Sequence, residues 1–196
     1  MSSHLLSTYA SLLRQWNARI NLVAPGTLDV LETRHIADCE QLKADMPEHP
    51  VSILDVGSGA GLPGLVLAIE APQHRYTLCE SDQRKAAFLM TAVQALGLKN
   101  VTVKPCRVEQ LETSELFAVI TCRAFAPLPR LLPQTRHLLA ADGCWLLLKG
   151  EAVDEELKAC ETLMPLAIQR RPSRVQGKGG ARGWVLKLVP GCETPR

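Results

Sequence analysis

The sequence has few aromatic residues and almost no excess of charge. Phenylalanine, tryptophan and tyrosine make up 4% of the 196 residues, so no stacking platform for single-stranded bases stands out. The net charge is only +2, so any nucleic-acid footprint must be local rather than spread over the whole protein. No internal repeat and no low-complexity segment is present.

Long apolar runs are also absent. No stretch approaches the length of a membrane span, and the N-terminus lacks the apolar core of a signal peptide. We therefore expect a cytoplasmic protein with no membrane association, and we expect it to act as a monomer.

Cysteine and histidine occur without the spacing of a metal or disulfide site. The seven cysteines form no C-x-x-C pair, and their odd number, spread through apolar stretches, predicts reduced and buried thiols. The five histidines are scattered singly. The sequence therefore indicates no metal site.

What is present is a strand, a glycine loop and a helix at residues 51–70. Ile53, Leu54 and Val56 are typical of a buried strand, and an apolar helix follows from Leu65. Between them lie glycines that permit positive φ and close approach to a ligand, at positions 57, 59, 61 and 64. Pro63 suits the first turn of the helix. This pattern predicts a cradle for a nucleotide-type cofactor, with an ordinary glycine turn as the alternative.

Two cofactors fit the loop. Residues 59–64 satisfy G-x-G-x-x-G, and Glu80 follows about 20 residues later, as a dinucleotide site requires. However, Asp55 ahead of glycines at alternate positions resembles the first motif of Rossmann-like S-adenosylmethionine (SAM) methyltransferases. There the loop faces the methionine part, and an acid after the second strand holds the ribose. We therefore favour SAM over NAD.

The chain order predicts an α/β fold with an N-terminal helical cap. Apolar residues at helical spacing predict two helices over residues 3–22 and 27–44, so residues 1–50 are expected to form a cap packed on a SAM-binding domain at residues 51–196. Helices are expected at 83–96, 127–139 and 153–164, and strands at 52–56, 76–79, 101–104, 118–121, 144–148, 166–175 and 184–189.

This alternation predicts a Rossmann-like, class I methyltransferase architecture. The sheet should have seven strands, be mostly parallel, and be covered on both faces. The last two strands should form a hairpin that gives the sheet an antiparallel C-terminal edge, which methyltransferase sheets carry and NAD-binding sheets generally lack.

Several patches in the right order resemble one family, RsmG (also called GidB). They are Trp16-Asn17, Asn21-Leu22, residues 34–38 and 56–64, Glu80-Ser81, Arg84-Lys85, Phe88-Leu89, residues 107–109, 123–126 and 148–150. The resemblance covers nearly the whole chain. Val23, where the family usually has Thr, and Ala181-Arg182, where it usually has Glu-Arg, depart from it.

The resemblance implies an enzyme that methylates guanine N7 in a decoding-centre loop of 16S ribosomal RNA. The cofactor would be S-adenosyl-L-methionine and the product S-adenosyl-L-homocysteine; the partner would be 16S ribosomal RNA or the small ribosomal subunit. Cofactor residues would be Gly57, Ser58, Gly59, Gly61 and Leu62 at the methionine end, Glu80, Ser81 and Asp82 at the ribose, and Val108 and Glu109 at the adenine. Glu109 could instead be a solvated acid in a first helical turn.

Basic residues are the candidates for substrate contacts. Arg123 follows the fourth strand, where this fold places the reacting centre, and we expect it to position the SAM carboxylate, a phosphate or a base edge. The candidates for RNA contact are Arg34, His35, Lys149, Arg170, Arg171, Arg174 and Arg182. The alternatives are a hydrogen-bonded helix histidine for His35 and a solvated hairpin edge for the C-terminal arginines.

Guanine N7 carries a lone pair and no proton, so its methylation needs no general base. A cysteine-dependent cytosine methyltransferase stays open as an alternative, because Cys122 lies near the fourth strand and Pro105-Cys106 follows the third. A second alternative is a non-catalytic RNA-binding or ribosome-assembly factor that only retains the fold.

Overall fold

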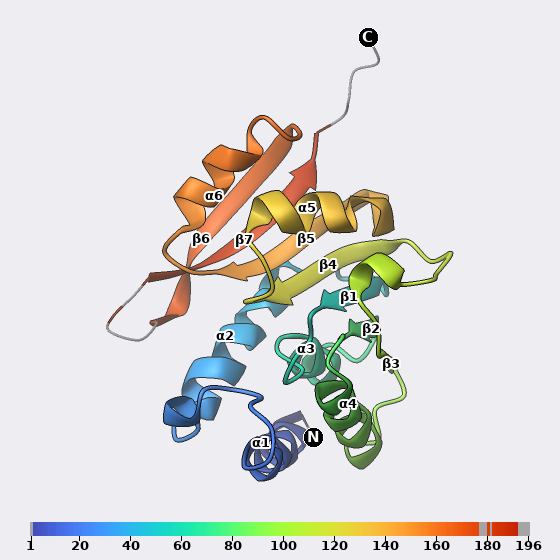
Figure 1. The fold of residues 1–196 in the computed structure, drawn as a ribbon, viewed down its shortest axis with the longest axis vertical. Coiled ribbons are helices and arrows are strands. Elements are labelled where there is room, and N and C mark those ends of the chain that lie inside the picture. Colours follow the sequence, from blue (N-terminus) through green and yellow to red (C-terminus); the bar gives the residue numbers. More distant parts are fainter. Residues whose placement is uncertain (1, 177–179, 181, 192–196) are drawn as a thin grey trace.

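The computed structural model describes residues 2–176, 180 and 182–191, without the side chains of Gln176 and Arg182. Its strands form one sheet in the order β3-β2-β1-β4-β5-β7-β6 (Figure 1). Their bounds are β1 Ser52–Val56, β2 Arg75–Cys79, β3 Val101–Lys104, β4 Phe117–Arg123, β5 Leu139–Lys149, β6 Leu166–Gln176 and β7 Arg182–Pro190. β1 to β5 pair in parallel, and β7 lies antiparallel between β5 and β6. The mostly parallel seven-stranded sheet with an antiparallel C-terminal edge is confirmed.

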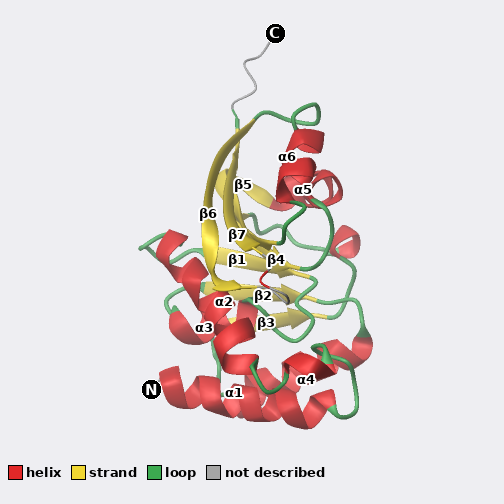
Figure 2. Ribbon diagram, turned by 90° about the vertical axis from the view of Figure 1, so that its left-hand side faces the viewer, coloured by secondary structure: helices red, strands yellow, loops and turns green. Residues whose placement is uncertain are grey.

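Helices cover both faces of this sheet. Their bounds are α1 Ser2–Asn17, α2 Ala37–Glu40, α3 Gly64–Glu70, α4 Gln83–Ala95, α5 Leu128–Thr135 and α6 Val153–Cys160. Figure 2 shows α3 on one side of the sheet and α5 and α6 on the other. Even the longest described helix, α1, lacks the length and apolar content to cross a bilayer, as do the other described helices.

The alternation of side chains along each strand divides the core into two layers. In β1, Ile53 packs into the layer with α1, α3 and α4, while Leu54 packs into the layer with α5 and α6. In β4, Cys122 belongs to the second layer. Arg123, the next residue, therefore faces the N-terminal cap.

The cap contains less regular helix than the sequence predicts. α1 ends at Asn17, whose side-chain oxygen accepts hydrogen bonds from the amides of Leu22 and Val23, both at 2.9 Å. These bonds offer the backbone a local alternative to the helix and stop it five residues early. Residues 25–45 form short turns: a 3-10 turn, a π-helical turn at Leu31–Ile36, α2, and a second 3-10 turn. The expected helices over 3–22 and 27–44 are wrong in extent.

The cap shares its core with the sheet domain. Tyr9 and Leu13 of α1 are fully buried in the same layer as Ile53 and Leu65. The hydroxyl of Tyr9 also donates a hydrogen bond of 2.6 Å to the carbonyl of Ala60 in the glycine loop. The cap therefore supports the glycine loop. The division of the chain into a cap at residues 1–50 and a SAM-binding domain at residues 51–196 stays a prediction.

Two boundaries after β4 also differ from the predicted ones. α5 ends at Thr135 and a 3-10 turn leads directly into β5, which begins at Leu139 rather than at Cys144. Leu139 pairs with Phe117, and the pairing then shifts register before Cys144 meets Val119. Asp142 and Gly143, which lie before the predicted strand at 144–148, belong to the irregular first part of this longer strand.

Candidate functional site

The predicted cofactor residues meet at one edge of the sheet. The glycine loop follows β1, Glu80 to Asp82 follow β2, and Val108 and Glu109 follow β3. Arg123 ends β4 and Lys149 ends β5. Because these five strands are parallel, their carboxyl ends lie side by side, which is where doubly wound sheets bind their ligands.

The glycine loop is held open by backbone conformations that favour glycine. Gly57, Gly59 and Gly61 have φ of 64°, 56° and 85°. At Gly59, a Cβ atom would come within 4 Å of one atom only, the carbonyl oxygen of Gly57 at 3.8 Å. The backbone at Gly59 is therefore accessible to a ligand.

Glu80 connects the second strand to this loop. One carboxylate oxygen accepts the amide of Gly59 at 2.7 Å, and the other accepts the amide of Asp82 at 2.8 Å. Glu80 is 7% exposed, so both bonds are shielded from solvent. A carboxylate has further lone pairs, so Glu80 can accept ribose hydroxyls while it holds the loop.

Asp55 supports the loop from beneath. Its side chain is 1% exposed, and its Oδ2 accepts the amide of Gly64 at 3.1 Å, where α3 begins. Burial raises the pKa of Asp55 to about 7. A Cβ atom on Gly64 would lie 2.5 Å from that oxygen, so the contact requires glycine. Pro63 precedes α3 as its N-cap residue rather than forming its first turn.

Three of the five residues expected at the ribose and adenine, Ser81, Val108 and Glu109, line a small cavity. It measures about 70 Å³ and lies among Gly57, Cys79, Ser81, Cys106, Arg107, Val108, Glu109, Phe125 and Arg130. We call it the small cavity. Asp82 lies beside it as the N-cap of α4, where its Oδ1 accepts the amides of Arg84 and Lys85. Glu109 accepts a hydrogen bond of 2.9 Å from the side-chain amide of Gln134.

Phe125 is a neighbour of the loop that the sequence did not single out. A Cβ atom on Gly57 would lie 2.3 Å from the Phe125 ring, so the ring lies directly against the loop backbone. The preceding Ala124 has a φ of 52°, which is rare for a residue with a side chain. Phe125 remains 37% exposed. Only the Arg-Ala-Phe-Ala patch after the fourth strand could have signalled it.

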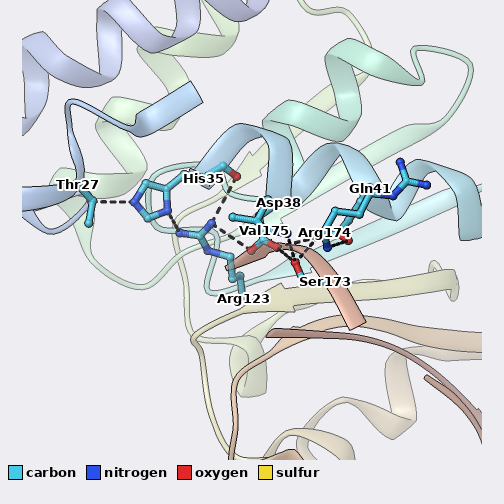
Figure 3. A network of polar contacts seen from close by, with 8 residues as sticks. All are labelled: Thr27, His35, Asp38, Gln41, Arg123, Ser173, Arg174 and Val175. Atoms are coloured by element: carbon cyan, nitrogen blue, oxygen red, sulfur yellow. Dashed lines mark hydrogen bonds and ion pairs between the residues drawn. The ribbon is translucent and has the colours of Figure 1, made fainter. Parts of the chain in front are cut away.

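Arg123 is bound to the cap (Figure 3). Its guanidinium donates to Nδ1 of His35 at 2.6 Å, and it lies 3.9 Å from the carboxylate of Asp38. Nε2 of His35 is 2.7 Å from the hydroxyl of Thr27. Burial lowers the pKa of His35 to about 4, with a further contribution from the charges of Arg123 and Arg34. The ring is therefore neutral at pH 7.

The cap also binds the C-terminal hairpin through a network that we call the cap–hairpin clasp. Its members are Asp38, Gln41, Asp45, Arg171 and Ser173. Arg171 donates to Asp45 at 2.6 Å and to the backbone carbonyl of Gln41 at 2.7 Å. Ser173 donates to Asp38 at 2.8 Å. The clasp joins segments about 130 residues apart in sequence.

A larger cavity opens beside Arg123, and we call it the mouth cavity. It measures about 390 Å³, within the range of small-molecule sites. Both cationic and anionic side chains line it: Arg34, Asp38, Arg123, Lys149, Glu151 and Glu156. Lys149 pairs with Glu156 at 2.7 Å and donates to the carbonyl of Ala126 at 3.1 Å. This pair ties the end of β5 to α6.

The predicted RNA-contact arginines have different surroundings. Arg170 pairs with Asp154 and lies over the ring of Trp184, while Arg171 belongs to the cap–hairpin clasp. Arg174 is exposed, and its side chain forms no ion pair within the described part of the chain. The side chain of Arg182 lies outside the described residues, as does all of Lys178, another base of this stretch.

The two cysteines of the alternative mechanism are poorly placed for catalysis. Cys122 is 1% exposed in the layer under α5, and burial raises the pKa of its thiol to about 12. It faces away from Arg123 and the mouth cavity. Cys106 lines the small cavity, next to Cys79.

Comparison with known proteins gives consistent matches over most of the chain. A family model described as rRNA small subunit methyltransferase G (GidB) matches residues 2–182. The ribosomal RNA small subunit methyltransferase G of Acidiphilium cryptum is 46% identical over 173 residues, covering 86% of this chain and 78% of that protein. The protein of the same name from Methylobacillus flagellatus is 41% identical over 191 residues, covering 97% of this chain and 84% of that protein.

Solved structures share the fold at low sequence identity. M. jannaschii TYW2 in complex with AdoMet has a TM-score of 0.65 at 16% identity, with 87% of this chain and 78% of that chain covered. TrmN from Thermus thermophilus has a TM-score of 0.62 at 18% identity, with 78% of this chain and 48% of that chain covered. At such identities the likeness shows the fold alone.

Proposed function

Because the chain belongs to the rRNA small subunit methyltransferase G (GidB) family, we propose that it transfers the methyl group of SAM to N7 of a guanine in 16S ribosomal RNA. The proposed target lies in the decoding-centre loop of the small subunit. The observation that carries the proposal for this chain is the carboxylate of Glu80, which holds the amide of Gly59 at 2.7 Å beside the open glycine loop.

The described residues fit SAM as the cofactor. Gly57 to Gly61 present backbone to the methionine end, and Glu80 presents a buried carboxylate to the ribose hydroxyls. Bound SAM supplies an electrophilic methyl group. The ring of Phe125 lies against Gly57 and lines the small cavity, so we expect it to turn aside when adenosine enters. Its exposed fraction of 37% leaves room for that movement.

The chain's contribution to the reaction is positioning. The N7 lone pair needs no deprotonation, so no side chain has to act as a general base. The neutral His35 and the buried Asp55 are therefore not required to move a proton. Holding the base in line and excluding water can contribute roughly 7–11 kcal/mol.

Arg123 is suited to hold an anionic or base-edge group rather than to touch the reacting nitrogen. Positive charge develops on the purine during transfer, and a nearby cation would oppose it. Its bond to His35 fixes the guanidinium at the wall of the mouth cavity. Arg34 lines the same cavity and is our candidate for contact with an RNA phosphate.

The substrate also sets where and how the enzyme acts. Bacterial ribosomal RNA is transcribed and assembled in the cytoplasm, so we propose that the protein acts there. We also propose that it acts as a monomer.

Nucleoside mass spectrometry tests the proposal directly. Purified protein is incubated with SAM and either free 16S ribosomal RNA or small subunits from cells that lack this gene. We expect N7-methylguanine to form at one position, and the two substrates distinguish naked RNA from the assembled particle. Calorimetric SAM binding without any methylation of either substrate would favour a non-catalytic assembly factor.

A further inference from the structure

Two cysteine side chains lie together at the adenine end of the site. The sulfurs of Cys79 and Cys106 are 3.9 Å apart. Cys79 ends β2, and Cys106 comes two residues after β3, the parallel neighbour of β2. The thiol of Cys79 donates to the carbonyl of Cys106 at 3.3 Å, so the two residues already contact one another through three atoms.

The two cysteines lie in the segments after β2 and β3 that carry the candidate cofactor residues. Cys79 directly precedes Glu80, and Cys106 stands two positions before Val108. Both cysteines line the small cavity together with Ser81 and Glu109. A covalent change at the pair would therefore act on the segments that the proposed function assigns to ribose and adenine.

The two thiols differ in access. Cys106 is the one cysteine that is not buried among the six whose surroundings the structure describes. Cys79 is 2% exposed, and its burial raises the pKa of its thiol. An exposed thiol reacts first with a soluble oxidant, and a second thiol within van der Waals distance can then resolve the product.

We propose that Cys79 and Cys106 are an oxidative modification site, at which hydrogen peroxide forms a reversible disulfide that closes the adenine end of the cofactor pocket. The thiol of Cys106 loses its proton, and the thiolate attacks one peroxide oxygen; the O–O bond breaks, giving a sulfenic acid and a hydroxide that takes up the proton to form water. The sulfur of Cys79 then attacks the sulfenic sulfur, loses its proton, and expels the hydroxyl as a second water. Two thiols are oxidised and one peroxide is reduced.

The bond changes the shape of the cavity. A disulfide separates its sulfurs by about 2.05 Å, so the two side chains must approach by about 1.9 Å. That movement removes the thiol's bond to the Cys106 carbonyl and ties the segment before Glu80 to the segment before Val108. In a cavity of about 70 Å³ such a shift opposes the opening that adenosine requires.

The experiment compares SAM binding by the reduced and oxidised full-length protein. After peroxide treatment and alkylation, peptide mass spectrometry should find Cys79 linked to Cys106. Calorimetry should then show SAM affinity reduced on the order of tenfold or more, with recovery after dithiothreitol. In Cys106→Ser, peroxide treatment should no longer change the SAM affinity, whatever that affinity is before treatment, whereas the matched control Cys160→Ser should keep the sensitivity to peroxide.

The outcomes separate this proposal from the proposed function, on which it rests. If the reduced protein fails to bind SAM, the proposed function itself is wrong. If the reduced protein binds SAM but no Cys79–Cys106 link forms, or the linked protein binds SAM equally well, the modification site is refuted. Prior saturation with SAM should slow formation of the link, because the cofactor and the oxidant reach the same cavity.

Discussion

The guanidinium of Arg123 donates to Nδ1 of His35 across 2.6 Å, and this bond fixes the tautomer of the ring. A guanidinium can only donate, so Nδ1 must be the acceptor and the proton lies on Nε2. Nε2 then donates to the hydroxyl of Thr27, which in turn donates to the carbonyl of Ala24 at 2.8 Å. One arrangement of protons therefore satisfies every hydrogen bond in this series, from Arg123 of β4 to Ala24 of the cap.

This arrangement predicts a pH dependence of stability. The pKa of His35 is lowered to about 4 in the fold and is about 6.5 in the unfolded chain, so between these values only the unfolded chain takes up the proton. Stability should therefore be unaffected above pH 6.5 by this group and fall as the pH drops toward 4, by up to about 3 kcal/mol. Urea unfolding of wild type and His35→Gln across this window measures the difference. Parallel pH profiles for the two proteins would contradict the assignment.

Glu80 should be essential for cofactor binding but not for folding. Glu80→Ala removes both the acceptor for the Gly59 amide and the carboxylate expected at the ribose, so SAM affinity should fall roughly tenfold to a hundredfold. Calorimetry measures the affinity, and circular dichroism verifies the fold. The exposed Glu112→Ala is the matched control and should bind SAM as wild type does. An unchanged affinity in folded Glu80→Ala would remove Glu80 from the site.

The contact between Gly57 and Phe125 can be measured with a second glycine as reference. Gly57 and Gly97 both have a φ of 64°, but a Cβ atom on Gly97 would meet nothing within 4 Å. Gly97→Ala should therefore cost only the backbone term, about 1–2 kcal/mol of unfolding free energy. Gly57→Ala should cost about 1 kcal/mol more, because its Cβ would force the exposed ring of Phe125 out of its present position.

Adding Phe125→Ala to Gly57→Ala should remove this additional cost and leave only the cost of the positive φ at residue 57. Chemical denaturation of the four variants, including the Gly57→Ala, Phe125→Ala double variant, completes the comparison. Equal losses for the two glycine substitutions, or no relief in the double variant, would show that the ring yields freely. The single variant Phe125→Ala should also bind SAM at a faster rate, since the ring no longer has to leave Gly57.

The C-terminal arginines should separate into structural and RNA-contacting groups. Arg174→Ala should reduce the slope of log affinity for RNA against log salt by about one unit, with stability unchanged. Arg171→Ala should lower the unfolding free energy by about 1–2 kcal/mol, because it breaks the clasp bonds to Asp45 and Gln41. Filter binding at several salt concentrations and urea unfolding measure the two effects. Identical salt slopes for wild type and Arg174→Ala would leave this residue as a solvated edge.

Cys122→Ala should retain methyl transfer. The thiol is buried, the pKa is raised to about 12, and the side chain lies on the far layer from Arg123, so a thiolate nucleophile is not available there. Formation of N7-methylguanine by the variant, followed by mass spectrometry, checks this. A folded variant that binds SAM but transfers no methyl group would support the covalent mechanism. RNA containing 5-fluorocytosine should then trap the wild-type enzyme as a covalent complex.

Local pattern was enough to predict the sheet and the edge of it at which the candidate cofactor residues meet. Strand-forming residues, the glycine spacing and the acid of Glu80 are short-range signals, and the strands that they mark end at a common edge. The predicted extent of the first cap helix was wrong because the amides of Leu22 and Val23 donate to the side chain of Asn17, which helical spacing does not reveal. Helix boundaries depend on such individual bonds.

The roles of the basic residues depend on tertiary partners that no local pattern contains. Lys149, Arg170 and Arg171 look alike in sequence, yet each is paired with a different acid: Glu156, Asp154 and Asp45. Phe125 was missed for the same reason, because its contact with Gly57 joins the ends of two strands. The sequence predicts a basic surface, but it does not show which basic side chains already form ion pairs within the protein.

The strand order also determines when the site can be completed during synthesis. β6 is made before β7, yet it pairs only with β7, which lies between it and β5. Arg171 and Ser173 on β6 can therefore reach Asp45 and Asp38 of the cap in their native places only after the chain has been made through about Pro190. We expect the nascent protein to form its glycine loop early and the cap–hairpin clasp last.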